Sequence, residues 1–374
     1  MRSRLGPILL VLTLQQLGAS GGAVAVAAGS TGLRAGALPT NPTSATIAMS
    51  TPGTSSSSGS ALPSSSRSRA SLLAFINGLS GQSRHILLGQ HTNYWDSNPM
   101  DIVTRIPTLT GSQVAMIGVG NFFLGDDGVS NSLGVSPAAY AAIANSWLAG
   151  GGIVVVTQEA SNPYSIGEPH ADIYTAGTNA NNKWNTYLDA QVAWFKQLHG
   201  AVIWRPFAEA NYGHSFGNLT PAEMVLLWQY THEYFASHGV TNVVWMLNLN
   251  AWDQRNRGST YFNGSDYYPG SEYVDIVSMD SYPPNAGPWV TTMYNYFVTT
   301  GKPIFFGEVG SNSNDGAVAA NTFDNSTILA QVKANFPKVV GMLFWCLKQG
   351  IAKQNGASTL MSDPAIITLG TLPH

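Results

Sequence analysis

Short apolar runs alternate with longer helical patterns from residue 85 to the end of the chain. Runs of this kind occur at 85–91, 114–121, 152–160, 201–211, 242–250, 274–282, 303–310 and 339–347. Runs that are nearly continuous in Val, Ile, Leu and Phe are typical of parallel strands covered on both faces. The pattern therefore predicts eight buried parallel strands.

The segments between these runs carry helix start signals. Ser136 precedes Pro137 as a helix cap, and Thr220 and Glu223 have the spacing of a capping box with Pro221 at the first helical position. Eight β/α units in roughly 300 residues predict a (β/α)8 TIM barrel, an α/β fold in a single domain. A doubly wound open sheet is the alternative.

Polar residues recur at the C-terminal ends of the predicted strands, and they favour the barrel over the open sheet. They are Gln90-His91, Asn121, Gln158-Glu159, Glu209 to Asn211, Asn248 to Asn250, Asp280 to Tyr282, and Glu308. In a closed barrel these ends converge on one mouth, where the catalytic residues of such barrels lie. In an open sheet they would form a line.

The first 67 residues differ in composition from the rest. Residues 1–28 contain two arginines, a short apolar run and then small residues, which is the pattern of a secretory signal peptide with cleavage near Ala25 or Ala28. An unprocessed N-terminus is the alternative. Residues 29–67 are rich in Ser, Thr, Pro and Gly and predict a flexible linker. We therefore expect a secreted, extracellular protein whose barrel domain spans 68–374.

Composition narrows the class of partner. Only 10% of the residues are charged, and the net charge of −3 gives no basic surface for nucleic acid. Ten Trp residues and many uncharged polar side chains suit a neutral sugar. We expect a polysaccharide as partner, no nucleic acid, and no membrane contact after signal cleavage. The single cysteine, Cys346, excludes an internal disulfide and lies in an apolar run, so we expect it to be buried.

Two glutamates stand at the ends of apolar runs. Glu209 lies in "WRPFAEANYG" and Glu308 in "FFGEVG", at the ends of the fourth and seventh runs. In a closed eight-stranded barrel these ends face each other, and a pair of facing carboxylates is the machinery of a glycosidase. Arg205 shares strand parity with Glu209, so we expect it to point inward beneath it and to support the ionised partner. A buried ion pair or a rim position is the alternative for either glutamate.

At this point the sequence resembles glycoside hydrolase family 26. The resemblance spans roughly 70–370 and is strongest in "WRPFAEANYG", "YVDIVSMDSYPP" and "FFGEVG". It implies a retaining β-mannanase-like enzyme with Glu209 as acid/base and Glu308 as nucleophile. It also maps a family Asp-Ser-Tyr motif onto Asp280, Ser281 and Tyr282. We expect a monomer that needs neither cofactor nor metal.

Two departures from the family pattern bear on the substrate. Ala208 stands where the family has a histidine, and Gln158-Glu159 stand where it has Trp-His. The resemblance implies endo-action on β-1,4-mannan, but these departures leave β-1,3-xylan and mixed-linkage β-glucan open. Transglycosylation or a lyase-like activity in the same cleft, and a barrel that binds polysaccharide without cleaving it, also remain open.

Further candidates for substrate contact are polar or aromatic residues expected near the mouth. Aromatic rings offer apolar area to sugar faces, and Tyr282 is also a candidate hydrogen-bond donor to Glu308. The full set of predicted substrate-binding residues is His91, Trp95, Glu159, Arg205, Asn211, Asp280, Tyr282 and Trp345.

Overall fold

The computed structural model describes residues 66–80, 85–120, 134–158, 169–211, 219–251, 264–282, 288–311 and 321–373. The chain divides into two units, Met1–Ser60 and Ala61–His374, and the first lies wholly outside the described residues. The signal peptide at 1–28, the linker at 29–67 and secretion therefore stay predictions.

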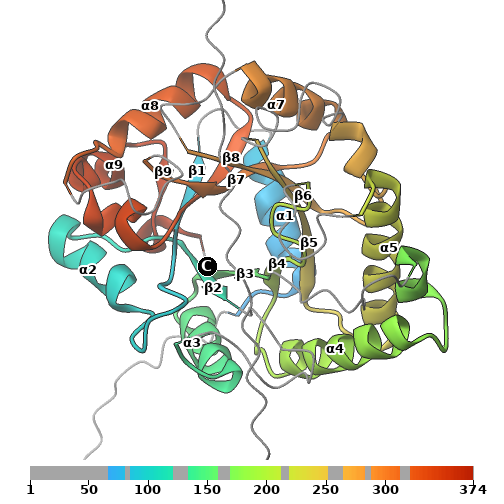
Figure 1. Ribbon diagram of the computed structural model, residues 1–374. Helices are drawn as coiled ribbons and strands as arrows, with labels where there is room; N and C mark the ends of the chain where they lie inside the picture. Colours follow the sequence, from blue (N-terminus) through green and yellow to red (C-terminus); the bar gives the residue numbers. More distant parts are fainter. Residues whose placement is uncertain are drawn as a thin grey trace, which may run out of the picture. The chain divides into compact units, whose positions relative to one another are not determined.

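Eight parallel strands close into a barrel, which confirms the predicted fold. The strands are β1 (Ile86–His91), β2 (Met116–Gly120), β3 (Ile153–Thr157), β4 (Val202–Arg205), β5 (Val243–Asn250), β6 (Ile276–Ser281), β7 (Ile304–Val309) and β8 (Val339–Phe344). They follow one another in chain order, and β1 pairs with both β8 and β2, so the sheet has no open end between them (Figure 1). A short ninth strand, β9 (Ile366–Ile367), pairs with the start of β1.

Helices surround the strands (Figure 1). They are α1 (Arg69–Ser80), α2 (Asp101–Thr110), α3 (Pro137–Ala149), α4 (Asn179–Lys196), α5 (Pro221–Ser237), α7 (Pro288–Thr300), α8 (Ser326–Asn335) and α9 (Ala357–Ser362). Short 3-10 turns lie at His170–Tyr174, Gly264–Tyr267, Leu347–Gln349, Ile351–Lys353 and Leu369–Thr371. Within the described residues, no helix combines the length and the apolar character needed to cross a bilayer.

Both predicted helix caps are present. The Ser136 side chain accepts a hydrogen bond from the Ala139 amide at the start of α3. At the start of α5, the Thr220 hydroxyl accepts from the Glu223 amide, and the Glu223 carboxylate accepts from the Thr220 amide at 2.7 Å. These reciprocal bonds satisfy backbone donors that the first helical turn leaves without partners.

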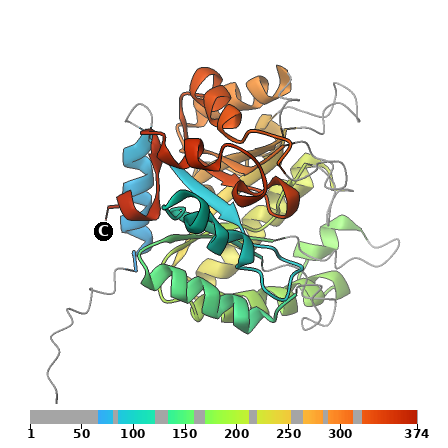
Figure 2. The ribbon, with the colours of Figure 1, turned by 90° about the vertical axis from the view of Figure 1, so that its left-hand side faces the viewer.

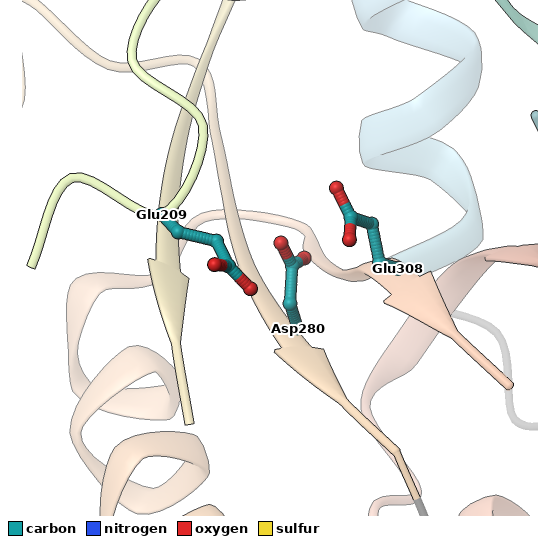
Figure 3. Close-up of side chains that lie close together, drawn as sticks. All are labelled: Glu209, Asp280 and Glu308. Carbon is teal, nitrogen blue, oxygen red and sulfur yellow. The ribbon is translucent and has the colours of Figure 1, made fainter. Parts of the chain in front are cut away.

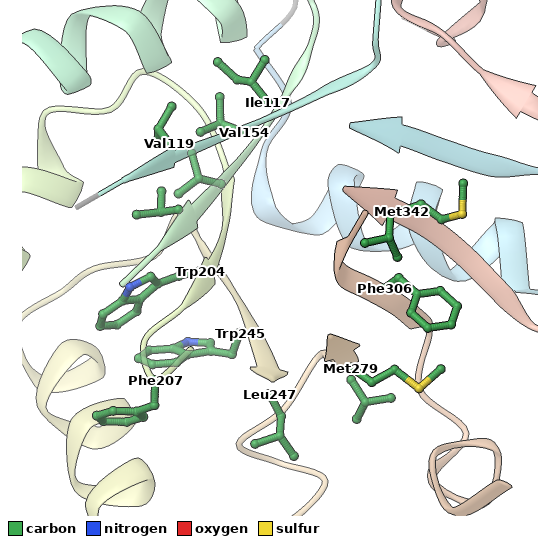
Figure 4. Close-up of a cluster of buried hydrophobic side chains, with 14 of the residues drawn as sticks. Ile117, Val119, Val154, Trp204, Phe207, Trp245, Leu247, Met279, Phe306 and Met342 are labelled. Carbon is green, nitrogen blue, oxygen red and sulfur yellow. The ribbon is translucent and has the colours of Figure 1, made fainter. Parts of the chain in front are cut away.

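Each strand is buried on both faces, which explains the continuous apolar runs. Alternate side chains, such as Val155, Ile203 and Phe305, form an inner cluster within the barrel. The intervening side chains, including Trp204 and Trp245, form an outer cluster between the strands and the helices (Figure 4). The period-2 alternation of a strand therefore separates two apolar layers.

Helix α1 closes the barrel at the N-terminal ends of the strands (Figure 2). Leu72, Ile76 and Leu79 lie on one face of this helix and pack in the inner cluster. Arg69 at its start donates to the Val243 carbonyl at the beginning of β5 and pairs with Asp275 just before β6. Access to the barrel interior is thus blocked at this end, and the opposite end is left for chemistry.

The fourth run forms a shorter strand than the predicted 201–211. Strand β4 ends at Arg205, and residues 206–211 form turns in which Glu209 has a φ of 51°. Pro206 has no amide hydrogen with which to continue the ladder, so the strand ends before it. The parity argument that linked Arg205 to Glu209 is therefore wrong. Arg205 does point inward, because it shares parity with Ile203 of the inner cluster.

The capping box at α5 gives a stability prediction. Replacing Thr220 with Ala removes the side-chain acceptor at the N-cap and should lower the free energy of unfolding by about 1 kcal/mol. Thr186→Ala, at an exposed position inside α4, is the matched control and should be neutral or slightly stabilising because Ala favours helix. Urea denaturation of both variants checks this; an equal loss in the two would contradict the assigned cap.

Candidate active site

Three carboxylates meet at the C-terminal ends of the strands. One carboxylate oxygen from each of Glu209, Asp280 and Glu308 lies within 4.8 Å of the other two. In Figure 3 the three side chains point toward one another from the turn after β4, from β6 and from β7. The closed barrel thus brings the two predicted glutamates face to face and adds a third acid between them.

A β-bulge in β7 turns Glu308 into the barrel. Met279 of β6 pairs with Phe306, but the next residue, Asp280, pairs with Glu308, so Gly307 is an extra residue. Phe306 packs in the outer cluster, and strict alternation would send Glu308 to the same side. Because the bulge adds one residue, Glu308 points inward instead.

The bulge requires glycine at position 307. A Cβ atom there would lie 2.7 Å from both Asn248 Nδ2 and Asp280 Oδ1. The Gly307 carbonyl accepts hydrogen bonds from His91 Nε2 at 2.8 Å and from Arg205 Nη1 at 3.2 Å. Two buried side chains therefore hold the irregular backbone in place.

The guanidinium of Arg205 lies beneath the carboxylates and is fully buried. Its Nη2 atom is 2.8 Å from Asp280 Oδ2 and 2.9 Å from Glu308 Oε1. Burial alone would lower the pKa of Arg205, but the charges of Asp280 and Glu308 outweigh burial and raise it above its ordinary value. Arg205 is thus a permanent positive charge that is placed to support Glu308.

Glu308 has a donor on each oxygen. Arg205 donates to Oε1, and the Tyr282 hydroxyl, the predicted donor, donates to Oε2 at 2.6 Å. Hydrogen bonds to both oxygens stabilise the charged form of a carboxylate. The geometry therefore suits an ionised group.

Glu209 has a different environment. Its amide donates to Asn248 Oδ1 at 2.7 Å, and Asn250 Nδ2 donates to its Oε1 atom at 2.5 Å. The donors to Glu308 include a guanidinium and a phenol, whereas Asn250 provides Glu209 with a neutral amide donor. Unlike environments are how paired carboxylates take separate acid and base roles.

Exposure separates the reacting candidates from their supports. Glu209 and Glu308 keep 8% and 6% of their surface, whereas Asp280 keeps 1% and Arg205 none. Asp280 Oδ2 accepts from Arg205 Nη2 at 2.8 Å and its Oδ1 accepts from Asn248 Nδ2 at 2.7 Å, so buried protein donors engage both oxygens. Asp280 therefore acts as a counter-charge that orients Arg205 rather than as a group open to substrate.

Two predicted substrate contacts have their polar atoms engaged by the protein. His91 is fully buried, with Nε2 bonded to the Gly307 carbonyl and Nδ1 to the Tyr94 hydroxyl. Asn211 donates to the Asn250 carbonyl at 2.9 Å and accepts from the Asn250 amide at 2.7 Å. This geometry favours support over substrate contact: His91 holds the bulge, and Asn211 ties the turn carrying Glu209 to β5.

Aromatic rings gather beside His91. Trp345 follows β8, and its ring centre lies 5.1 Å from His91 and 6.3 Å from Trp95. Trp95 is 46% exposed and Trp345 is half-buried, so both offer accessible ring surface in this aromatic group. Such rings suit the apolar face of a sugar, and the contact of Trp95 and Trp345 with substrate stays a prediction.

Of the three residues that depart from the family pattern, the structure describes Ala208 and Gln158. Ala208 is buried in the turn that carries Glu209. The Gln158 side chain accepts from the Trp204 indole at 2.8 Å, which directs it into the outer layer. Glu159 lies outside the described residues, so its predicted contact with substrate stays a prediction.

Sequence reasoning did not assign Asn248 and Asn250. Both are buried and lie two residues apart on β5, with the inward parity of Met246. That shared parity at a strand end was the available signal. The structure joins both to Glu209.

The three carboxylates have the spacing of a metal site, but their surroundings do not fit one. Side chains donate to both oxygens of Glu308 (Arg205 and Tyr282), to both oxygens of Asp280 (Arg205 and Asn248) and to Oε1 of Glu209 (Asn250). The guanidinium already supplies the positive charge, and it would repel a divalent cation at the same place.

Comparisons with known proteins find glycosyl hydrolases among the similar sequences. The family model described as "Glycosyl hydrolase family 26" matches residues 62–370. The chain is 24% identical to the "Mannan endo-1,4-beta-mannosidase A and B" of Caldalkalibacillus mannanilyticus over 60% of this chain and 46% of that protein. It is 25% identical to a Bacillus subtilis mannan endo-1,4-beta-mannosidase over 46% of each. The chain thus covers less than half the length of these curated relatives.

Solved structures show the same fold. A Bacillus subtilis mannanase superposes with a TM-score of 0.66 at 21% identity, over 82% of this chain and 94% of that one. A family 26 domain from a Prevotella bryantii endo-β-mannanase/endo-β-glucanase gives a TM-score of 0.63 at 19% identity, over 83% and 98%.

The burial of His91 predicts a pH-dependent stability. Burial lowers the pKa of His91 from 6.5 to about 4, so between these pH values the folded chain binds fewer protons than the unfolded chain. The contribution of His91 to the free energy of unfolding is complete above pH 6.5. It falls by roughly 3 kcal/mol as the pH is lowered toward 4.

Replacement of His91 tests this. In His91→Gln the pH-dependent contribution of His91 to the free energy of unfolding disappears. The difference in stability between this variant and wild type should therefore narrow as the pH is lowered from 6.5 toward 4. His199→Gln, at an exposed histidine, should keep the wild-type pH slope. Urea denaturation at several pH values provides the measurement. A His91→Gln slope equal to that of wild type would show that His91 is not the group responsible.

Proposed function

The chain belongs to glycosyl hydrolase family 26, and from this premise we propose that it hydrolyses a β-linked polysaccharide with retention of anomeric configuration. The observation that carries the proposal is the approach of Glu209 and Glu308 to within 4.8 Å at the strand ends. Retaining glycosidases place their carboxyl groups about 5–5.5 Å apart, whereas inverting enzymes leave room for a water, at about 6.5–9.5 Å.

In the first step Glu308 attacks the anomeric carbon and Glu209 protonates the leaving glycosidic oxygen. The bond to that oxygen breaks as the bond to Glu308 forms, which gives a covalent glycosyl-enzyme. Arg205 and Tyr282 hold Glu308 ionised and oriented before the attack. The Asn250 amide donates to Oε1 of Glu209 and thereby orients its carboxyl group.

In the second step Glu209 is the base. It takes a proton from water, the water oxygen bonds to the anomeric carbon, and Glu308 leaves as a carboxylate. Arg205 stabilises the charge that returns to Glu308, since its guanidinium stays 2.9 Å away and cannot lose its proton at working pH. Two inversions at one carbon give net retention.

The proposed first substrate is β-1,4-mannan. The names of the curated relatives support it, because they are mannan endo-1,4-β-mannosidases. Ala208 and Gln158-Glu159 differ from the family pattern near the reacting sugar, so β-1,3-xylan and mixed-linkage β-glucan are the substrates to compare. Trp95 and Trp345 are the proposed stacking surfaces.

Removal of either glutamate should abolish most of the activity. Glu209→Gln should lower kcat on polysaccharide by about 10²–10⁴-fold, the usual contribution of an acid/base group, and Glu308→Gln by at least as much. Glu272→Gln, an exposed glutamate, is the matched control and should keep wild-type activity. Reducing ends released from the three polysaccharides give the readout. A wild type that binds glycan but releases none would identify a binding protein instead.

The stereochemistry of the product is a separate test. Proton NMR of an early digest should show the β-anomer of the new reducing end before mutarotation. An initial α-anomer would mean direct attack by water, which the spacing of Glu209 and Glu308 disfavours.

A further inference from the structure

The side-chain amide of Asn248 makes all the hydrogen bonds that an amide can make. This residue lies in β5 and is fully buried. Its Oδ1 atom accepts from the Glu209 amide and from Arg205 Nη2, each at 2.7 Å. Its Nδ2 atom donates to Asp280 Oδ1 at 2.7 Å and to Ser278 Oγ at 3.0 Å. Two donors and two acceptor lone pairs are the full capacity of the group.

The partners determine which way this amide points. The Glu209 N–H and the guanidinium of Arg205 can only donate, and the carboxylate of Asp280 accepts. Aspartate at position 248 could accept from the first two but has no donor for the third, and alanine could do neither. An amide of this length meets all the requirements.

Asn248 also holds a strained backbone. Glu209 has a φ of 51°, in the left-handed region that non-glycine residues rarely adopt because it is sterically unfavourable. Three successive amides of this turn are held by neighbouring strands. Ala208 donates to the Gln158 carbonyl, Glu209 to the Asn248 side chain, and Ala210 to the Asn248 carbonyl. Only the middle bond depends on a side chain, so it alone can be removed by substitution.

We propose that Asn248 is a positioning residue for Glu209. By holding the Glu209 amide it fixes the backbone from which the acid/base carboxylate is aimed. Its bond to Arg205 also fixes the position of that backbone relative to the guanidinium that pairs with Glu308. Asn248 touches neither the scissile bond nor the reacting atoms, and the inference rests on the proposed roles of Glu209 and Glu308.

Two substrates whose leaving groups differ in basicity can distinguish a misplaced acid, Glu209, from a weakened nucleophile, Glu308. A phenyl glycoside needs a proton on its leaving oxygen, whereas a 2,4-dinitrophenyl glycoside leaves without one. The value of kcat/KM reports the first step alone, up to the glycosyl-enzyme. Both compounds are made on the β-1,4-linked mannose disaccharide, the repeating linkage of the proposed first substrate.

In Asn248→Ala we expect kcat/KM to fall roughly 10²-fold on the phenyl glycoside, the cost of a displaced catalytic group, and less than about threefold on the dinitrophenyl glycoside. Asn248→Asp keeps the acceptor for Glu209 but sets a second carboxylate against Asp280. Its loss should therefore be the same for both leaving groups. Asn242→Ala is the matched control, because Asn242 bonds to the Phe195 and Gly200 carbonyls at the other end of β5. It should keep wild-type kcat/KM.

Thermal melting confirms that each variant is folded before the rates are compared. If Asn248→Ala does not fold, Asn248→Ser replaces it, since a serine hydroxyl is too short to reach the Glu209 amide. Equal losses on the two glycosides in a folded Ala or Ser variant would overturn the inference. A wild type inactive on both glycosides and on the polysaccharides would instead refute the proposed function, so the two failures are distinguishable.

Discussion

A buried guanidinium imposes the strongest constraint on this barrel. Arg205 has no exposed surface, and a charge in that position is tolerated only when its surroundings supply acceptors and opposite charge. They come from β3, β5, β6 and β7: the Thr157 hydroxyl, the Asn248 amide, the Asp280 carboxylate, and the carbonyl of Gly307 with the carboxylate of Glu308. One side chain of β4 therefore orders the C-terminal ends of the strands on which the proposed chemistry depends.

Two departures from regular structure aim the glutamates at each other. The extra residue Gly307 turns Glu308 inward, and a left-handed turn places Glu209 beyond the end of β4. Each irregularity is held by buried polar side chains, His91 and Arg205 for the bulge and Asn248 for the turn. Irregular backbone has amide and carbonyl groups that the sheet does not pair, so buried side chains must form hydrogen bonds with them. A site that places two carboxylates within 4.8 Å therefore requires these side chains as well.

Features that depend on residues close together in the chain could be predicted, whereas features that depend on contacts between distant strands could not. The apolar runs matched the strands, and the Ser136 and Thr220 caps were confirmed, since these signals depend on neighbours a few residues away. The extension of the fourth strand to 211 was wrong, because Pro206 ends the ladder at Arg205. Asn248 was not assigned a role, although it sits at a noted strand end, because an amide in an apolar run has many possible partners until the neighbouring strands are known.

By itself, the sequence determined that eight buried strands alternate with helices, that polar residues cluster at the strand ends, and that Glu209 and Glu308 are the acids to compare. Period and spacing along one segment carry that information. Only the tertiary structure decided that His91 and Asn211 face the protein, that Asp280 balances Arg205, and that Gly307 is an extra residue in β7. Register between strands and the direction of a buried side chain arise from contacts between distant segments, and no single segment contains them.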